Sequence, residues 1–159
     1  MENLKVFLDD GAYMPVRAHE ADAGMDLLAP KTVPGIDGKM RPLDFSVTRH
    51  QPATINTGVH ISIPKGYVGL IKAKSGLNVK KGIQATGVID AGYSGPIVVK
   101  LYTLESEADI QIRPEMKICQ LLIVPVETPG LDLVSLEELK EDAAKASARK
   151  EGGFGSTGK

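Results

Sequence analysis

Hydrophobic and polar residues alternate along much of this chain with the two-residue period of a half-buried β-strand. The clearest run extends from Ile55 to Ile63, where isoleucine, threonine and valine occupy every second position. Shorter runs lie at 4–8, 68–70, 97–101 and 110–112, and residues 118–126 are apolar apart from Gln120. Turns rich in glycine and proline separate the runs. The pattern predicts an antiparallel β-sandwich or barrel rather than alternating helices and strands.

One helix is predicted near the C-terminal end. Ser135 and Glu138 have the spacing of a capping box, which satisfies free backbone N–H groups of a first helical turn. The apolar residues that follow fall on one face: Leu136, Leu139, Ala143 and Ala146. Because alanine buries little area, we expect this helix to pack loosely or to project. The chain, one domain overall, then divides into a β domain (1–126), a helical linker (127–150) and a flexible, glycine-rich arm (151–159).

Composition narrows the class of protein. A chain of 159 residues can bury a core without disulfides, and its single cysteine, Cys119, lies among apolar residues. We interpret it as a buried thiol in a reducing compartment. No window approaches the ~20 apolar residues of a membrane span and no leader pattern opens the chain, so we expect a cytoplasmic protein without a membrane partner. A net charge of −1 argues against nucleic-acid binding.

The C-terminal sequence EGGFGSTGK, residues 151–159, combines glycines, hydroxyls and one aromatic ring. Successive glycine N–H groups can converge on an anion, and Ser156 and Thr157 add hydroxyl donors. Phe154 could cover the face of a planar ligand. The pattern therefore suits a phosphate-containing ligand, although a disordered terminus is the alternative.

Two further segments carry charge among glycines and resemble loops at strand ends. In AGMDLLA, residues 23–29, Asp26 is either a turn cap or part of a site. In KSGLNVKKG, residues 74–82, Lys74 supplies charge, Ser75 a donor and Gly76 room for a phosphate oxygen. A solvated, lysine-rich turn is the alternative for the second segment.

Two other segments place polar groups at the ends of apolar runs. In GVIDAGYSG, residues 87–95, Asp90 follows an apolar pair and could hold a water at a sheet edge. Tyr93 could form the floor beneath a sugar or pack over its own turn. In KICQL, Gln120 is either an internal hydrogen-bonded strut or a ligand contact.

Taken in order, AGMDL, KSGL, GVIDAGY, KICQL and GGFGSTG resemble the five motifs of the trimeric dUTP pyrophosphatases, or dUTPases. The resemblance implies a distorted jelly roll, a homotrimer with shared active sites, and hydrolysis of dUTP to dUMP and pyrophosphate. That reaction limits uracil in DNA and supplies dUMP for thymidylate synthesis. Mg²⁺ would be the cofactor, held by substrate and water without direct protein ligands, and Asp26 would at most contact its water.

The resemblance also assigns roles to residues. Asp90 would orient and deprotonate the attacking water, and Tyr93 would lie beneath the deoxyribose. The main chain around residues 85–88, with the Gln84 amide, would read uracil. The residues expected to contact substrate are Lys74, Ser75, Gly76, Gln84, Thr86, Gly87, Tyr93, Gln120, Arg149, Phe154, Gly155, Ser156 and Thr157.

The chain departs from the family pattern at three places. Lys74 stands where arginine is usual, so a bidentate fork becomes a point charge. Gly92 replaces an acidic residue, and Lys150 with Glu151 occupies positions that are usually small. The rival functions are a dCTP deaminase, disfavoured because Lys100 holds the place of its essential glutamate, and a non-catalytic nucleotide-binding or regulatory protein of the same fold.

Overall fold

The computed structural model describes residues 3–34, 38–106 and 109–146, which divide between two compact units, Met1–Glu127 and Thr128–Lys159. The elements of the first unit are β1 (Val6–Leu8), β2 (Gly24–Leu28), β3 (Thr32–Pro34), β4 (Met40–Pro42), β5 (Phe45–Thr48), β6 (Ala53–Asn56), β7 (Val59–Ile61), β8 (Tyr67–Ala73), α1 (Ser75–Lys81), β9 (Ile83–Ile89), β10 (Val98–Thr103), β11 (Asp109–Ile112) and β12 (Lys117–Pro125). The described part of the second unit contains α2 (Leu136–Ala146).

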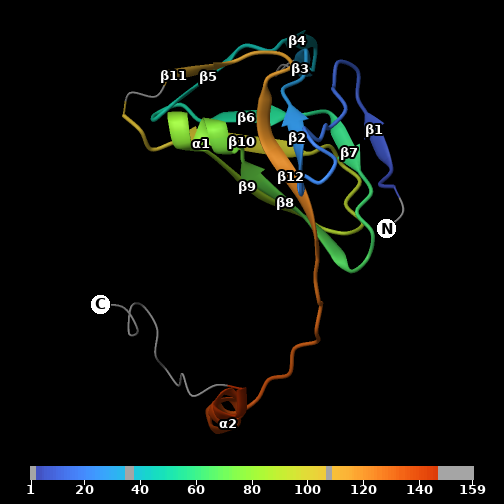
Figure 1. The fold of residues 1–159 in the computed structure, drawn as a ribbon, viewed down its shortest axis with the longest axis vertical. Coiled ribbons are helices and arrows are strands. Elements are labelled where there is room, and N and C mark those ends of the chain that lie inside the picture. Colours follow the sequence, from blue (N-terminus) through green and yellow to red (C-terminus); the bar gives the residue numbers. More distant parts are fainter. Residues whose placement is uncertain (1–2, 35–37, 107–108, 147–159) are drawn as a thin grey trace. The chain divides into compact units, whose positions relative to one another are not determined.

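The first unit is built from antiparallel strands, as the alternating sequence predicts. Its largest sheet has the order β2-β12-β8-β9-β10-β6, and smaller pairs are β1-β7, β5-β11 and β3-β4 (Figure 1). One face of these strands buries a continuous aliphatic core that includes Leu27, Ile55, Ile71, Leu101 and Leu121. Each of the apolar runs singled out in the sequence contributes to a strand, which confirms the all-β class.

The run from Ile55 to Ile63 differs from expectation, because it forms two strands instead of one. Gly58 separates β6 from β7 with a left-handed φ of 67°, and a Cβ at this position would lie 2.8 Å from the Ala12 Cβ. Thr57 satisfies its buried hydroxyl by donating to the Ile97 carbonyl at 2.8 Å. The chain therefore leaves the large sheet at β6 and joins β1 through β7, while the buried side chains keep their alternation.

Two segments expected to be loops have regular structure. Residues 75–81 form helix α1, which ends at Gly82 in the left-handed conformation that glycine favours. Residues 24–28 form strand β2, where Asp26 pairs with Gln120 of β12 and bridges to Val16. The sequence signal for a loop was misleading in both cases, because Gly24 and Gly82 mark the ends of elements and the charged Asp26 is buried within its strand.

The predicted C-terminal helix is confirmed as α2. The Glu138 N–H donates to the Ser135 hydroxyl at 3.2 Å, which is one half of the expected capping box. Leu136 and Leu139 are both more than half exposed, so its apolar face is thin, as expected. Among the described residues, no helix is long and apolar enough to cross a membrane.

Candidate active site

Three neighbouring strands of the large sheet bring a buried carboxylate between two lysines. Lys74 Nζ lies 2.9 and 3.1 Å from the two carboxylate oxygens of Asp26, and Lys117 Nζ lies 2.9 Å from Oδ2. The Asp26 side chain is 8% exposed, whereas those of Lys74 and Lys117 are 34% and 39% exposed. We call Asp26, Lys74, Lys117 and Gln120 the Asp26 cluster.

The charge on Asp26 is maintained by its lysine partners. Burial alone would raise the pKa of this carboxyl, but the hydrogen bonds and charges of Lys117 and Lys74 outweigh burial and hold the pKa below its ordinary value. Asp26 is therefore ionised at neutral pH, and the cluster has one excess positive charge. Such a group favours the approach of an anion.

Gln120 has the first of the two roles that the sequence left open, that of an internal hydrogen-bonded strut. Its side-chain amide donates to the Ala73 carbonyl at 3.2 Å, which fixes it as a strut between β12 and the end of β8. Gly24 of β2 leaves the space that this side chain occupies, since a Cβ there would lie 2.4 Å from Gln120 Oε1. The side chain is only partly buried and lies in the strand beside Asp26, so it remains available at the edge of the cluster.

The backbone next to Lys74 is open to a ligand. Lys74 is the N-cap of α1, and its ammonium, which cannot accept a hydrogen bond from the free N–H groups of the first turn, donates to Asp26 instead. Ser75 and Gly76 are exposed in the first turn, and a Cβ added to Gly76 would meet no described atom within 4 Å. The expected phosphate ligands thus lie at one helix start, in helical rather than loop conformation.

The second group of candidate residues lies in the turn after β9. We call residues 90–95 the Asp90 turn. Its backbone is closed by the Tyr93 N–H, which donates to the Asp90 carbonyl at 3.2 Å, and by Gly92 with a φ of 88°. The Tyr93 hydroxyl donates to the Pro96 carbonyl at 3.0 Å and the ring lies against Gly95, so the tyrosine packs over its own turn. It is nevertheless 45% exposed.

Strand β9 has an unpaired edge just before this turn. Its register with β10 ends at the pair Ala85–Leu101, and residues 98–100 of β10 pair only with β6, on the other edge of β10. Residues 86–89, including Thr86 and Gly87, continue along β8 and have no strand on the β10 side within the described chain. Their backbone groups on that side are free to meet a planar ligand edge. Gln84 lies apart from this edge, opposite Tyr102 of β10.

The Asp26 cluster and the Asp90 turn lie at opposite ends of the β8–β9 ladder. Lys72 pairs with Thr86 and Gly69 with Ile89, so the same register brings Lys74 level with Gln84 and Asp90 level with Val68. Val68 and Lys74 are six residues apart along the chain, which corresponds to about 20 Å along a strand. A triphosphate is shorter than this backbone separation.

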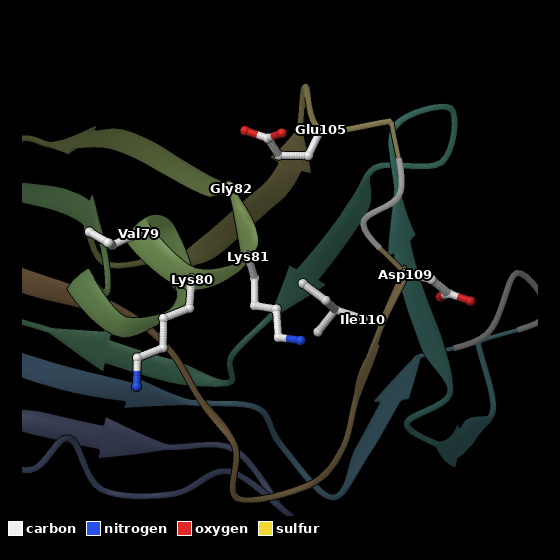
Figure 2. A pocket seen from close by; sticks show the side chains of 7 residues that line it. All are labelled: Val79, Lys80, Lys81, Gly82, Glu105, Asp109 and Ile110. Atoms are coloured by element: carbon white, nitrogen blue, oxygen red, sulfur yellow. The ribbon is translucent and has the colours of Figure 1, made fainter.

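A pocket of about 420 Å³ lies at the other end of α1 from Lys74. It is lined by Val79, Lys80, Lys81, Gly82, Glu105, Asp109 and Ile110. Figure 2 shows that its lysines and carboxylates come from different segments and point away from one another. None of the candidate residues from the sequence lines it, so we do not assign the site here.

Comparison with known proteins decides the family. The family model for dUTPase matches residues 10–158. This chain belongs to the dUTPase family. The deoxyuridine 5'-triphosphate nucleotidohydrolase of Mycobacterium sp. (strain JLS) is 38% identical over 154 residues, which cover 95% of this chain and 91% of the relative. The enzyme of the same name from Mycobacterium marinum is 37% identical over 156 residues, 96% and 92% of the two chains.

Solved dUTPase structures share the fold, which confirms the expected jelly-roll-like architecture. A variant of the Staphylococcus bacteriophage 80alpha dUTPase with dUpNHpp has a TM-score of 0.79 and 30% identity, and the match covers 100% of both chains. A dUTPase variant from phage phi11 of S. aureus, whose structure shows a coordinated structural Mg(II) ion, has a TM-score of 0.69 and 31% identity, with 84% of this chain and 97% of that chain covered.

The remaining residues considered in the sequence of this dUTPase-family chain are those of the C-terminal arm and Cys119. Arg149, Phe154, Gly155, Ser156 and Thr157, with the Lys150 and Glu151 pair, lie outside the described residues. Cys119 is fully buried, which confirms the predicted buried thiol, and burial together with the charge of Asp26 raises its pKa to about 12. Lys117 was missed by sequence reasoning, although it stands first in the KICQL run and three residues before Gln120.

Proposed function

We propose that this protein hydrolyses dUTP to dUMP and pyrophosphate. The observation that carries the proposal is the placement of Asp90, an exposed carboxylate that directly follows the unpaired edge of β9 in a chain of the dUTPase family. Free backbone N–H and C=O groups along a strand edge can hydrogen-bond to a base. The Asp90 carboxylate, which follows that edge, can then activate a water molecule at the α-phosphate. The activity named for the curated relatives is the same hydrolysis.

In this proposal Asp90 acts as the general base. Its carboxylate accepts a proton from a water molecule and orients that water for attack on the α-phosphorus. The P–O bond to the departing pyrophosphate breaks as the new P–O bond forms, giving dUMP. Tyr93 contacts the deoxyribose and leaves no room for a 2′-hydroxyl, while the main chain of Thr86 and Gly87 bonds to the uracil edge.

The Asp26 cluster would bind the phosphates. Lys74, Ser75 and Gly76 supply a charge, a hydroxyl and open N–H groups at the start of α1, and Gln120 supplies an amide. Because Lys117 also contacts Asp26, Lys74 can turn toward a phosphate without leaving a buried carboxylate unpaired. In this way Lys74 would bind a phosphate by exchanging its carboxylate partner, whereas an arginine would bind it with two N–H donors of one guanidinium group.

The donor set suits Mg²⁺ that is carried by the substrate. Mg²⁺ prefers phosphate, carboxylate and water oxygens, and the described residues contain no group of three or more His, Cys, Asp or Glu side chains that could hold it. The ionised Asp26 would contact its bound water rather than the ion. When bound, the ion neutralises charge on the pyrophosphate leaving group.

The distance between the two groups supports an active site shared between copies of the chain. Asp90 and Lys74 of one chain are separated by about 20 Å of backbone along the β8–β9 ladder, which favours a site where Asp90 of one subunit meets the phosphate ligands of another. A closed ring of three subunits gives every Asp90 turn a neighbouring Asp26 cluster, and we propose this homotrimer. The C-terminal arm, with Arg149, Phe154, Gly155, Ser156 and Thr157, would close over the bound nucleotide.

The test is a nucleotide panel on the full-length protein with Mg²⁺. We expect pyrophosphate from dUTP and none above background from UTP or dTTP. Parallel assays use the Asp90→Asn variant and a chain ending at Lys150, and both are expected to lose turnover. Binding of dUTP without turnover would support the non-catalytic alternative, ammonia release from dCTP would support the deaminase, and full activity of the shortened chain would exclude the arm as a lid.

A further inference from the structure

His60 connects the Asp90 turn to the strands beside it. Its Nδ1 lies 2.8 Å from the Ser94 carbonyl oxygen, and its Nε2 lies 3.2 Å from Asp9 Oδ1. The ring packs edge-on against Phe7, its cross-strand neighbour on β1, with centroids 5.3 Å apart. Within the described chain, the His60 contact is the hydrogen bond by which residues 90–96 are tied to another element.

The two partners of this imidazole require the same protonation state. A backbone carbonyl accepts hydrogen bonds only, and an ionised carboxylate also accepts only. Both contacts can therefore form together only if Nδ1 and Nε2 each carry a proton, which makes the ring an imidazolium. The side chain is 21% exposed and that of Asp9 is 45% exposed, so the group is accessible to proton exchange.

We propose that His60 is a positioning residue which, as imidazolium, clamps Ser94 and so holds the Asp90 turn in the conformation that binds nucleotide. The proposal rests on the proposed function, because it assigns the turn to substrate binding. The clamp fixes the backbone one residue after Tyr93. When the clamp is lost, a smaller fraction of the protein has the Asp90 turn in the binding conformation, and the apparent affinity for nucleotide falls in proportion to that fraction.

The charged and titratable groups around the clamp favour the protonated ring. The Ser94 carbonyl and the Asp9 carboxylate raise the pKa of His60, against burial, which lowers it. The surrounding hollow, about 290 Å³, is also lined by Lys5 and by Tyr93. Since the pKa is raised in the folded protein, the clamp is complete at low pH and is lost as pH rises through that value. The KM for dUTP should accordingly rise above about pH 6.5.

Two substitutions separate positioning from titration. His60→Leu removes both hydrogen bonds and should raise KM by about threefold to tenfold, with a smaller change in kcat. His60→Asn keeps an N–H near the position of Nδ1, so it should restore most of the affinity and abolish the rise of KM with pH. Asp9→Asn should shift that rise to lower pH. His50→Leu, at an exposed histidine in a distant turn, is the matched control and should behave as the wild type.

Imidazole NMR gives a readout that does not depend on turnover. We expect His60 to carry protons on both nitrogens at pH values below about 6.5, and its titration to move to lower pH in Asp9→Asn. Titration of His60 at the same pH in Asp9→Asn as in the wild type, or wild-type KM and pH profile in His60→Leu, would overturn the proposal. If the protein binds dUpNHpp but does not hydrolyse dUTP, the proposed function fails while the clamp is still tested, through dUpNHpp affinity against pH in the same variants.

Discussion

The Asp26 cluster and the Asp90 turn each present a carboxylate, but the two carboxylates are held differently. Asp26 lies inside a sheet, between two lysines that contact both of its oxygens. Asp90 lies in an exposed turn whose hydrogen bond to another element comes from His60. The cluster is held by ion pairs within the large sheet of its own chain, whereas the turn is exposed and lies beyond the end of β9. Under the proposed function, the cluster binds the phosphates of the substrate and the turn acts on the nucleotide bound at a neighbouring subunit.

The largest expected effect is a loss of kcat in a variant that still binds nucleotide. Asp90→Asn keeps the shape of the side chain but cannot accept a proton, so kcat should fall by about 10³-fold. Affinity for dUpNHpp should change little, because the Asp26 cluster is intact; steady-state kinetics and calorimetry measure the two quantities. A fall in affinity as large as the fall in kcat would show that Asp90 binds substrate rather than water.

A mixing experiment tests whether the two regions meet across subunits. Asp90→Asn and Lys74→Met should each have low activity at dUTP concentrations below KM. If each site takes Asp90 from one chain and Lys74 from another, co-refolding equal amounts should restore activity in about one quarter of the sites. Wild-type protein taken through the same refolding step is the control. Mixtures no more active than the average of the two parents would place both residues in one subunit.

The sequence predicted the Asp90 turn better than the Asp26 cluster. Glycines and an acid after an apolar strand are local signals, and the turn is where they placed it. The cluster depends on the register of β2, β12 and β8, which aligns Asp26 with Gln120 across strands far apart in sequence. Lys117 was invisible for this reason, because nothing in its local sequence shows that it faces Asp26.

The local sequence also failed to predict where β6 ends and that residues 75–81 form a helix. The alternation from Ile55 to Ile63 was right about which side chains are buried, yet it could not show that Gly58 moves the chain from one sheet to another. Residues 75–81 lack a long apolar face, and α1 is closed at its C-terminal end by Gly82, whose backbone N–H donates to the Asn78 carbonyl. Short helices of this kind depend on packing rather than on helix propensity.

A smaller effect concerns stability. Asp26→Asn leaves two partly exposed ammonium groups without their carboxylate, and we expect the free energy of unfolding to fall by about 2 kcal/mol. Asp90→Asn, at an exposed turn, should change it by less than about 0.5 kcal/mol. Urea denaturation at pH 7 measures both. Equal losses in the two variants would remove the distinction between a structural and a projecting carboxylate.

The smallest effect is the pH dependence of that stability. The lysines hold the pKa of Asp26 below its ordinary value, so the folded protein binds this proton less readily than the unfolded chain. The stabilisation is therefore complete above about pH 4, the ordinary range of an aspartate, and is lost as pH falls through the lower pKa of the folded state. Comparing urea midpoints at pH 7 and pH 3 should show a larger decrease for the wild type than for Asp26→Asn. Because both proteins share every other carboxylate, the difference between their decreases belongs to Asp26, and equal decreases would mean that the lysine contacts do not persist in solution.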